Sequence, residues 1–252
     1  MNKLYKYTIF ISGKLEVKLQ NLKDKEIEKL KLVLLPCREP IPEEARAAYN
    51  SAYRLWHSVW SETLKELDGV EKLFSNEFTR HDFFAAIFKG EDAISLTCYS
   101  GIDLKLDARK NDAWFESWPQ DFLQKETERE AEILIGAWYC VAPEYRKSRL
   151  DFPFNVAKVM METFGKVILD EGYSVGYGTS RNNRGVNKLL YDIGAIKYGE
   201  SFAHGCTVDL VLVEPENVRK VQLSYSNIFK KLWENRIDYR KEKYEQKLPK
   251  AA

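Results

Sequence analysis

Histidine and cysteine are both scarce in this sequence, and their scarcity argues against several kinds of site. The three histidines are His57, His81 and His204, and the four cysteines are widely spaced and form no CxxC pair. A structural zinc site needs closely spaced ligands, and a secreted disulfide scaffold needs denser cysteine. We therefore expect no metal, and we expect thiols that are reduced and mostly buried.

Long apolar runs are also missing. The opening, MNKLYKYTIFISGKLEV, contains only the short apolar run Thr8–Ile11, which is too short for the core of a signal peptide. No stretch approaches the roughly 18 apolar residues that span a bilayer. The formal net charge is +1, which gives no electrostatic reason to expect a nucleic-acid or membrane partner. We expect a cytoplasmic protein with no membrane span.

Alternating strand and helix patterns fill the rest of the chain, which is 44% hydrophobic and 31% charged, as in an ordinary globular protein. Residues 5–35 read as strands, with a hairpin at Ser12–Gly13 and a further strand or short helix at KLKLVLL. An amphipathic helix is predicted over residues 43–67.

The period then changes to that of strands joined by helices. The predicted elements are two strands within 81–104 linked at 89–92, a central strand at 131–141, a helix at 154–172, a strand at 173–180, a short helix at 182–195 opened by an asparagine cap, a strand at 206–213 and one amphipathic helix at 218–247. This order is typical of an α/β (α+β) fold. We predict a single domain, 1–252, whose core is about 81–214. Residues 1–80 add strands and a helix, and 215–252 add a C-terminal helix.

Residues 131–200 carry a resemblance to a known family. An apolar strand runs into VAPEYR, a helix and a strand follow, and NRGVNKLLYDIGA closes the series. This series resembles the GNAT superfamily of acyl-CoA-dependent N-acyltransferases. The resemblance implies a GNAT-like mixed central sheet flanked by helices, with extra N-terminal and C-terminal helices.

The resemblance also implies where an acyl thioester binds. A strand splayed from its neighbour can pair with the pantetheine arm as an added strand would, and the N-terminus of the next helix can receive the pyrophosphate. The residues that it places at the donor are Tyr139, Cys140, Val141, Arg146, Lys147, Ser148, Arg149 and Asn183. The thioester carbonyl would lie near residues 137–141, where backbone N–H groups would stabilise the oxyanion.

The phosphate turn departs from the family pattern. The family usually has R-x-x-G-x-G/A here, but Arg149 and Asp151 fill the two glycine positions. Asp151 must then turn away from a phosphate or serve as the helix N-cap. Arg146, Lys147 and Arg149 can bind phosphate through their side chains instead. A similar replacement occurs in relatives that take acyl groups from acyl carrier protein, such as autoinducer synthases and N-acyl amino acid synthases. An acyl carrier protein therefore stays open as the donor beside acetyl-CoA or another acyl-CoA.

The resemblance implies a tyrosine as the general acid, four residues before the glycine that ends the second helix. Counting back from Gly194 reaches Leu190, and Tyr191 lies one residue later. One residue turns a helical side chain by about 100°. Tyr191 is nevertheless the candidate for the acid.

The general base has several candidates. Glu132 is favoured by its position early on the predicted central strand, and Glu130, His81, Asp82 and His204 are alternatives. Cys140 is interpreted as a core residue, not as a nucleophile. The predicted function is transfer of an acyl group from a thioester to a small-molecule amine by direct attack. The alternatives are a non-catalytic GNAT-like binding module and, with little support from the charge, an aminoacyl-tRNA-dependent transferase.

Overall fold

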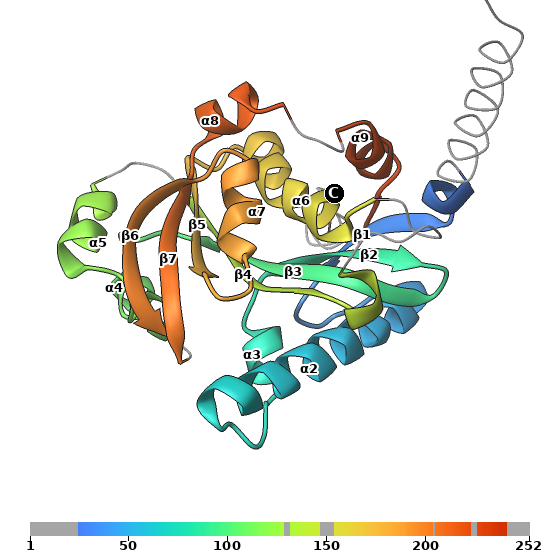
Figure 1. Cartoon of the computed structure of the whole chain (residues 1–252), viewed down its shortest axis with the longest axis horizontal. Helices are drawn as coiled ribbons and strands as arrows, with labels where there is room; N and C mark the ends of the chain where they lie inside the picture. The colour runs from blue at the N-terminus through green and yellow to red at the C-terminus, as the bar shows by residue number, and fades with distance from the viewer. Residues whose placement is uncertain (1–24, 129–131, 147–153, 204, 223–225, 241–252) are drawn as a thin grey trace, which may run out of the picture.

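The computed structural model describes residues 25–128, 132–146, 154–203, 205–222 and 226–240 (Figure 1). Within them the strands are β1 (Leu30–Pro36), β2 (Phe83–Lys89), β3 (Asp92–Ile102), β4 (Ile133–Val141), β5 (Val175–Arg181), β6 (Ile196–Ala203), β7 (Cys206–Val213) and β8 (Ile237–Asp238). The helices are α2 (Arg46–Asp68), α3 (Asn76–Thr79), α4 (Asp107–Lys110), α5 (Gln120–Thr127), α6 (Val156–Glu171), α7 (Val186–Asp192), α8 (Pro215–Lys220) and α9 (Ser226–Glu234), with 3-10 turns η1 (Glu43–Ala45), η2 (Ala113–Phe115) and η3 (Pro143–Tyr145).

One mixed sheet carries all of the described strands, in the order β6-β7-β5-β4-β3-β2-β1-β8. Strands β1 to β4 form an antiparallel meander. Strand β5 then pairs parallel to β4 after the α6 crossover, because a parallel neighbour needs a long connection, usually a helix. Strand β7 lies antiparallel between β5 and β6. The pairing therefore changes from antiparallel to parallel between β4 and β5, in the middle of the sheet.

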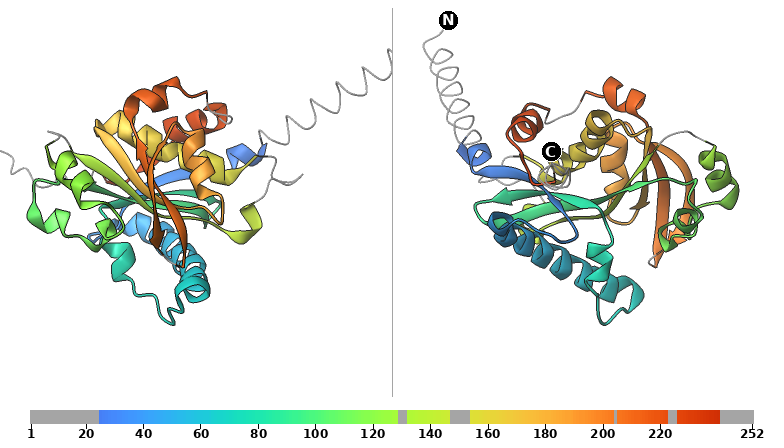
Figure 2. Two further views of the ribbon diagram at one scale, coloured as in Figure 1. Left: turned by 60° about the vertical axis from the view of Figure 1, so that its left-hand side comes forward. Right: turned by 180° about the vertical axis from the view of Figure 1, so that it is seen from behind.

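Helices cover both faces of the sheet. Helix α2 lies on one face, and α6, α7 and α9 lie on the other (Figures 1 and 2). On the α6 face, Met160 and Phe164 pack with Leu134 and Tyr99. On the α2 face, Trp56 belongs to a second cluster with β1, β2 and β3 side chains. The alternation of side chains along a strand separates these two cores.

A third apolar cluster lies at the β5–β7 end of the sheet. Phe115, Trp118 and Phe122, from η2 and the α5 region, pack against Ile135 and Tyr177. The Trp118 and Tyr177 rings stack with their centroids 5.1 Å apart. The tryptophan-bearing segment between β3 and β4 is therefore packed onto the sheet beside β4 and β5.

Most of the predicted elements are confirmed. The helix predicted over 43–67, the two strands within 81–104, the central strand, the helix after it and the strands at 173–180 and 206–213 all form, with small shifts at their ends. The segment KLKLVLL is the strand β1. The hairpin predicted at Ser12–Gly13 lies outside the described residues.

The helix caps differ from the prediction. Helix α7 begins after Gly185, whose φ of +69° is left-handed, and no side-chain hydrogen bond caps it, so the predicted asparagine cap is wrong. Helix α6 is capped by Asn155, whose side chain accepts a hydrogen bond from the Lys158 N–H. The N-cap of α6 is therefore Asn155 and not Asp151, which lies outside the described residues.

Two features of the C-terminal part differ from the prediction. Strand β6 was not among the predicted elements: its apolar residues Ile196, Tyr198 and Phe202 alternate along it, but they are exposed and form no buried face. The single helix predicted over 218–247 is interrupted: α8 ends at Lys220, Val221 is extended, and α9 follows. The chain then adds β8 beside β1, with the Tyr239 N–H donating to the Leu34 carbonyl at 3.0 Å. This pairing covers the edge of β1, which would otherwise expose unpaired backbone groups.

Candidate active site

Strands β4 and β5 diverge in the middle of the sheet. They pair only through Ile133–Ile135 and Val175–Tyr177, at their amino ends. Beyond that point, β4 continues through Val141 and β5 through Arg181 without pairing to each other. The β5-facing edge of β4 therefore lacks strand partners from Gly136 onward, and the two strands form a V-shaped opening.

A bulge interrupts β4 at the opening. On the β3 side, Ala137 pairs with Cys98 and Cys140 pairs with Leu96, so two β4 residues, Trp138 and Tyr139, oppose one residue of β3. Trp138 has a φ of +56°, which is uncommon for a residue with a side chain. A bulge leaves its extra residue out of the ladder. The backbone of Trp138 and Tyr139 therefore departs from the regular β3 ladder beside the opening.

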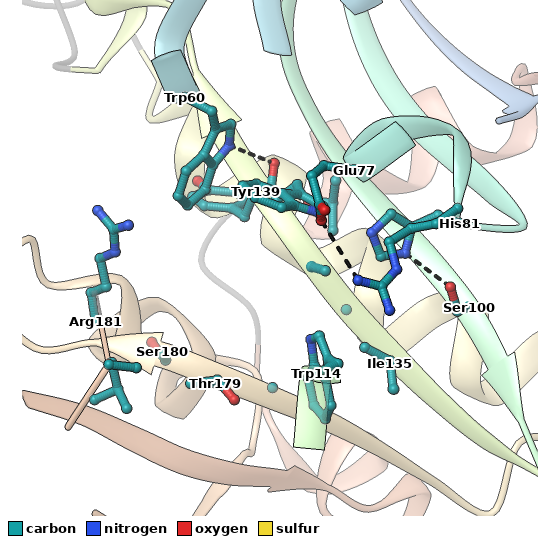
Figure 3. A pocket seen from close by; sticks show the side chains of 18 of the residues that line it. Trp60, Glu77, His81, Ser100, Trp114, Ile135, Tyr139, Thr179, Ser180 and Arg181 are labelled. Carbon is teal, nitrogen blue, oxygen red and sulfur yellow. Dashed lines mark hydrogen bonds and ion pairs between the residues drawn. The ribbon is translucent and has the colours of Figure 1, made fainter. Parts of the chain in front are cut away.

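A cavity of about 540 Å³ adjoins the opening (Figure 3). Its walls come from α2 and the segment after it, the α3 region, β3, β4, β5, α6, α7 and the segment between β3 and β4. Lining residues include Trp60, Phe74, Arg80, His81, Ser100, Trp114, Gly136, Ala137, Trp138, Tyr139, Met161, Phe164, Thr179, Ser180, Arg181, Val186 and Leu190. Residues from both faces of the sheet contribute, so the cavity continues through the opening between β4 and β5.

Aromatic side chains hold the α2 wall of the cavity against β4. The Trp60 indole N–H donates to the Trp138 carbonyl at 3.1 Å. The two indole rings meet edge to face, with centroids 4.8 Å apart, a preferred geometry for aromatic pairs. Trp60 thus fixes the bulge in place from the neighbouring layer.

His81 is a buried imidazole on the cavity wall. It is 4% exposed, and its Nδ1 lies 2.9 Å from the Ser100 hydroxyl. Its Nε2 has no hydrogen-bond partner among the described residues. Burial first, and then the positive charge of Arg80, lowers the pKa of His81 to about 3. The ring is therefore neutral at physiological pH, with one nitrogen available to a ligand.

Arg181 is a buried guanidinium at the end of β5. It is 7% exposed and lines the cavity. Its guanidinium carbon lies 4.9 Å from the centroid of the Trp60 ring. No hydrogen bond or ion pair holds it in the part of the chain that the structure describes, and its Nη2 is buried without a partner. Burial lowers the pKa of Arg181.

Arg80 lines another part of the cavity wall, and its positive charge is neutralised by neighbouring carboxylates. Its guanidinium bonds Asp112 at 2.5 Å and lies 3.6 Å from Glu77. Burial opposes the charge, but these two carboxylates raise the pKa of Arg80. Across the described residues, no cluster of histidine, cysteine, aspartate and glutamate is arranged to hold a metal ion.

The β4 residues predicted at the donor lie at the opening. Tyr139 lines the cavity, and its hydroxyl donates to the Ala157 carbonyl at 3.0 Å. Cys140 is buried, and burial raises the pKa of its thiol to about 12. The Val141 carbonyl accepts a hydrogen bond from the exposed Arg146, whose Nε lies 3.1 Å away. The loop residues Lys147, Ser148 and Arg149 lie outside the described residues, and so do Glu130 and His204.

Tyr191 and Leu190 point to different places. Leu190 lines the cavity, whereas Tyr191 is not part of its wall and donates its hydroxyl to Asp209. Burial and then this hydrogen bond raise the pKa of Tyr191 to about 12. Although burial opposes its charge, hydrogen bonds from Tyr191 and from Asn187 lower the pKa of Asp209 to about 2.

Two further predicted residues, Glu132 and Asn183, are exposed. Glu132 immediately precedes β4, at the paired end of the V, and its backbone carbonyl accepts the Ser174 N–H at 3.2 Å. Its side chain does not line the cavity. Asn183 lies in the exposed turn between β5 and α7. The catalytic and binding roles given to all of these residues stay predictions.

Known structures with the same architecture include two synthases. The AHL synthase LasI superposes with a TM-score of 0.53 at 11% identity, over 80% of this chain and 95% of that one. The CoA-dependent acyl-homoserine lactone synthase BjaI, in a complex with SAM and isopentyl-CoA, superposes with a TM-score of 0.51 at 12% identity, over 83% of this chain and 92% of that one. The chain has a GNAT-like fold. No family model matches the sequence, and no curated protein sequence matches it significantly.

The GNAT-like fold was predictable, but two cavity residues were not singled out from the sequence. Trp60 belongs to an apolar stripe on α2 that is equally typical of a core helix. Arg181 follows the strand pattern YSVGYGTS directly, where a charged residue normally marks a solvent-exposed strand end. Only the fold places Arg181 beneath Trp60, where its guanidinium is removed from water.

Proposed function

We propose that the chain is an N-acyltransferase that moves an acyl group from a coenzyme A or acyl-carrier-protein thioester to an amine. The observation that carries this proposal is the opening between β4 and β5, with the β4 bulge beside it and a cavity running through it. An extended thioester arm needs unpaired backbone on one side and a reaction space beside it. The opening provides both.

The donor arm is proposed to lie along the free edge of β4. Its amide groups pair with β4 backbone groups as an added strand would, which brings the thioester carbonyl to the bulge at Trp138 and Tyr139. A backbone N–H at the bulge then donates to that oxygen as negative charge develops on it. A fixed donor in a water-poor site is worth far more to a transition state than one in water.

The acceptor amine enters the cavity from the α2 face. Its nitrogen lone pair attacks the carbonyl carbon, so that a C–N bond forms and the carbonyl becomes an oxyanion. The intermediate then collapses, the C–S bond breaks, and the thiolate leaves with a proton. The amine nitrogen must also lose one proton during this sequence.

His81 is the proposed acceptor of that proton, directly or through a water molecule. The residue lines the cavity and its buried Nε2 has no partner among the described residues, while Ser100 can fix Nδ1 as the protonated nitrogen. The lowered pKa keeps the ring neutral at physiological pH, so that it can accept a proton, but it also makes the ring a weaker base than a solvated imidazole. Glu132 is a weaker candidate, because it is exposed at the closed end of the V. The resemblance predicts Tyr191 as the general acid, but its hydroxyl donates to Asp209 and the residue is not part of the cavity wall, so the proposal does not assign the acid to it.

No covalent enzyme intermediate is proposed. Cys140 is the cysteine on β4, but its thiol is buried and its pKa is raised to about 12. Since the thiolate is the nucleophilic form of cysteine, this side chain is inert at neutral pH. Direct attack by the amine needs no such intermediate.

Donor binding tests the proposal. Isothermal titration with acetyl-CoA, a long-chain acyl-CoA and the matching acyl carrier protein thioester is expected to show binding of at least one of them. Ala137→Phe, which fills the cavity beside β4, is expected to abolish that binding. Ala47→Phe is the matched control, because Ala47 is exposed on α2 and does not line the cavity.

The donor series also separates the open alternatives. Preference for the carrier thioester over coenzyme A thioesters of the same acyl group identifies the carrier protein as the donor, and equal binding removes its support. Failure of every donor to bind the wild-type chain would contradict the acyltransferase and favour a binding module.

A further inference from the structure

The unpaired Arg181 guanidinium has a consequence for the acceptor. A buried arginine is normally paired, since burying an isolated charge costs several kcal/mol. In the described chain, the Arg181 guanidinium forms no hydrogen bond or ion pair, and it lies over the face of Trp60, a cation–π contact that compensates little of that cost. The nearest acids, Glu66 and Asp68, raise its pKa only through space and form no ion pair with it. Its charge is therefore left to be balanced by something else.

The neighbouring polar groups are also unsatisfied. The Ser180 hydroxyl is buried without a hydrogen-bond partner, next to Arg181 and on the same cavity. By contrast, Arg184 at the same end of β5 is exposed and paired with Glu66. Glu66 therefore pairs with the exposed arginine, whereas the buried Arg181 has no ion pair among the described residues.

The position of Arg181 assigns its ligand to the acceptor side. Arg181 packs against Trp60 of α2, and α2 lies on the face of the sheet opposite α6 (Figures 1 and 2). The phosphates of a donor are expected at the N-terminus of α6, on that other face. Arg181 and His81 lie on opposite sides of the cavity (Figure 3), so one acceptor molecule can reach both.

We propose that Arg181 binds a carboxylate of the acceptor, so that the substrate is an amine that also carries a carboxylate. This inference rests on the proposed function and specifies its acceptor. A guanidinium holds a carboxylate through two parallel N–H···O hydrogen bonds, and here it would do so with little competition from water. The aromatic wall formed by Trp60, Phe74 and Trp114 favours an apolar or aromatic remainder.

Three ligands that share a phenyl ring and differ in their charged groups test the proposal. L-phenylalanine has the carboxylate and the amine, 3-phenylpropionate keeps only the carboxylate, and phenethylamine keeps only the amine. In titrations of the wild-type chain, both carboxylates are expected to bind roughly tenfold or more tightly than phenethylamine, because hydrogen bonds to charged groups contribute about 1.5–3 kcal/mol. Equal affinity for phenylalanine and phenethylamine, or binding of none of the three, overturns the proposal.

Matched variants locate the effect. Arg181→Gln is expected to remove the preference for carboxylates, and Arg181→Lys to retain part of it. Arg184→Gln, at the exposed arginine nearby, is expected to leave it unchanged. A melting temperature of Arg181→Gln at or above that of the wild type shows that the variant is folded. A carboxylate preference that survives in the folded Arg181→Gln variant contradicts the assignment.

A last comparison separates the acceptor from an anionic donor. Succinyl-CoA and butyryl-CoA share a four-carbon acyl group and differ in the terminal carboxylate. If Arg181→Gln weakens the binding of succinyl-CoA alone and leaves the affinities for phenylalanine, 3-phenylpropionate and phenethylamine unchanged, the carboxylate that Arg181 binds belongs to the donor and the proposal fails. The carboxylate titrations contain no thioester, so they can succeed even where no donor binds. Binding of the carboxylates without binding of any donor would contradict the acyltransferase proposal and would still support a carboxylate site at Arg181.

Discussion

The buried imidazole of His81 gives the protein a specific dependence of stability on pH. Its pKa is lowered from 6.5 to about 3 in the folded chain, chiefly by burial, with a further lowering by Arg80 and Arg38 and an opposing effect of Asp112. In the unfolded chain the ring binds a proton near pH 6.5. Between these two values the unfolded state binds one more proton than the folded state, so the free energy of unfolding falls as the pH falls.

The size of the effect follows from the two pKa values. Each pH unit inside this window changes the free energy of unfolding by about 1.4 kcal/mol. At pH 4.5 the loss relative to pH 7.5 therefore amounts to about 2.7 kcal/mol from this residue alone. His81→Gln replaces the ring by a group that does not titrate, and we expect the variant to lose this part of the slope.

Urea unfolding at half-unit steps from pH 7.5 to pH 4.5 measures the slope. The difference between the wild type and His81→Gln is the relevant quantity, because contributions of other groups cancel in it. His57→Gln on α2, at a half-buried histidine outside the cavity wall, is the matched control for the loss of an imidazole. Parallel curves for the wild type and His81→Gln would refute the picture of a desolvated imidazole on the cavity wall.

Three further substitutions test neighbouring parts of the account. Arg181→Met removes an unpaired buried charge and its cation–π contact with Trp60, so the free energy of unfolding should rise by about 1 kcal/mol, or roughly 2–4 °C in melting temperature; a lower melting temperature would show that the charge is compensated. Tyr191→Phe removes the hydrogen bond to Asp209 and should cost about 1 kcal/mol in urea unfolding while changing acyl transfer only a few-fold; a loss of 10²-fold or more would instead establish the tyrosine as the acid. Cys140→Ala should cost about 1 kcal/mol and leave turnover intact, whereas loss of turnover would point to a covalent step.

The fold was largely predictable because its signals are local. The continuous apolar run of β4 and the regular stripes of α2 and α6 specify their own elements. The secondary structure near the C-terminal end was harder to predict. The sequence there has a helical pattern throughout, but residues 237–238 form the strand β8 because they pair with β1. The apolar residues of strand β6 alternate along it, but they are exposed and form no buried face.

The candidate site was only partly predictable, for a different physical reason. The sequence indicated that β4 forms one side of the site, because an apolar strand followed by VAPEYR resembles a known arrangement. A register shift at Trp138 and the loss of pairing after Ile135 depend on how three strands meet, and no local pattern encodes that. The burial of Arg181 depends likewise on where α2 lies.

A structure with a donor analogue bound tests the central claim most directly. The suitable probe is a non-hydrolysable thioether analogue of acyl-pantetheine, since coenzyme A and acyl carrier protein share that arm. We predict the arm between β4 and β5, with its carbonyl oxygen within hydrogen-bond distance of the backbone N–H of Trp138 or Tyr139. An analogue bound elsewhere, or a β4–β5 opening that stays closed to it at saturating concentration, would contradict the proposed acyltransferase.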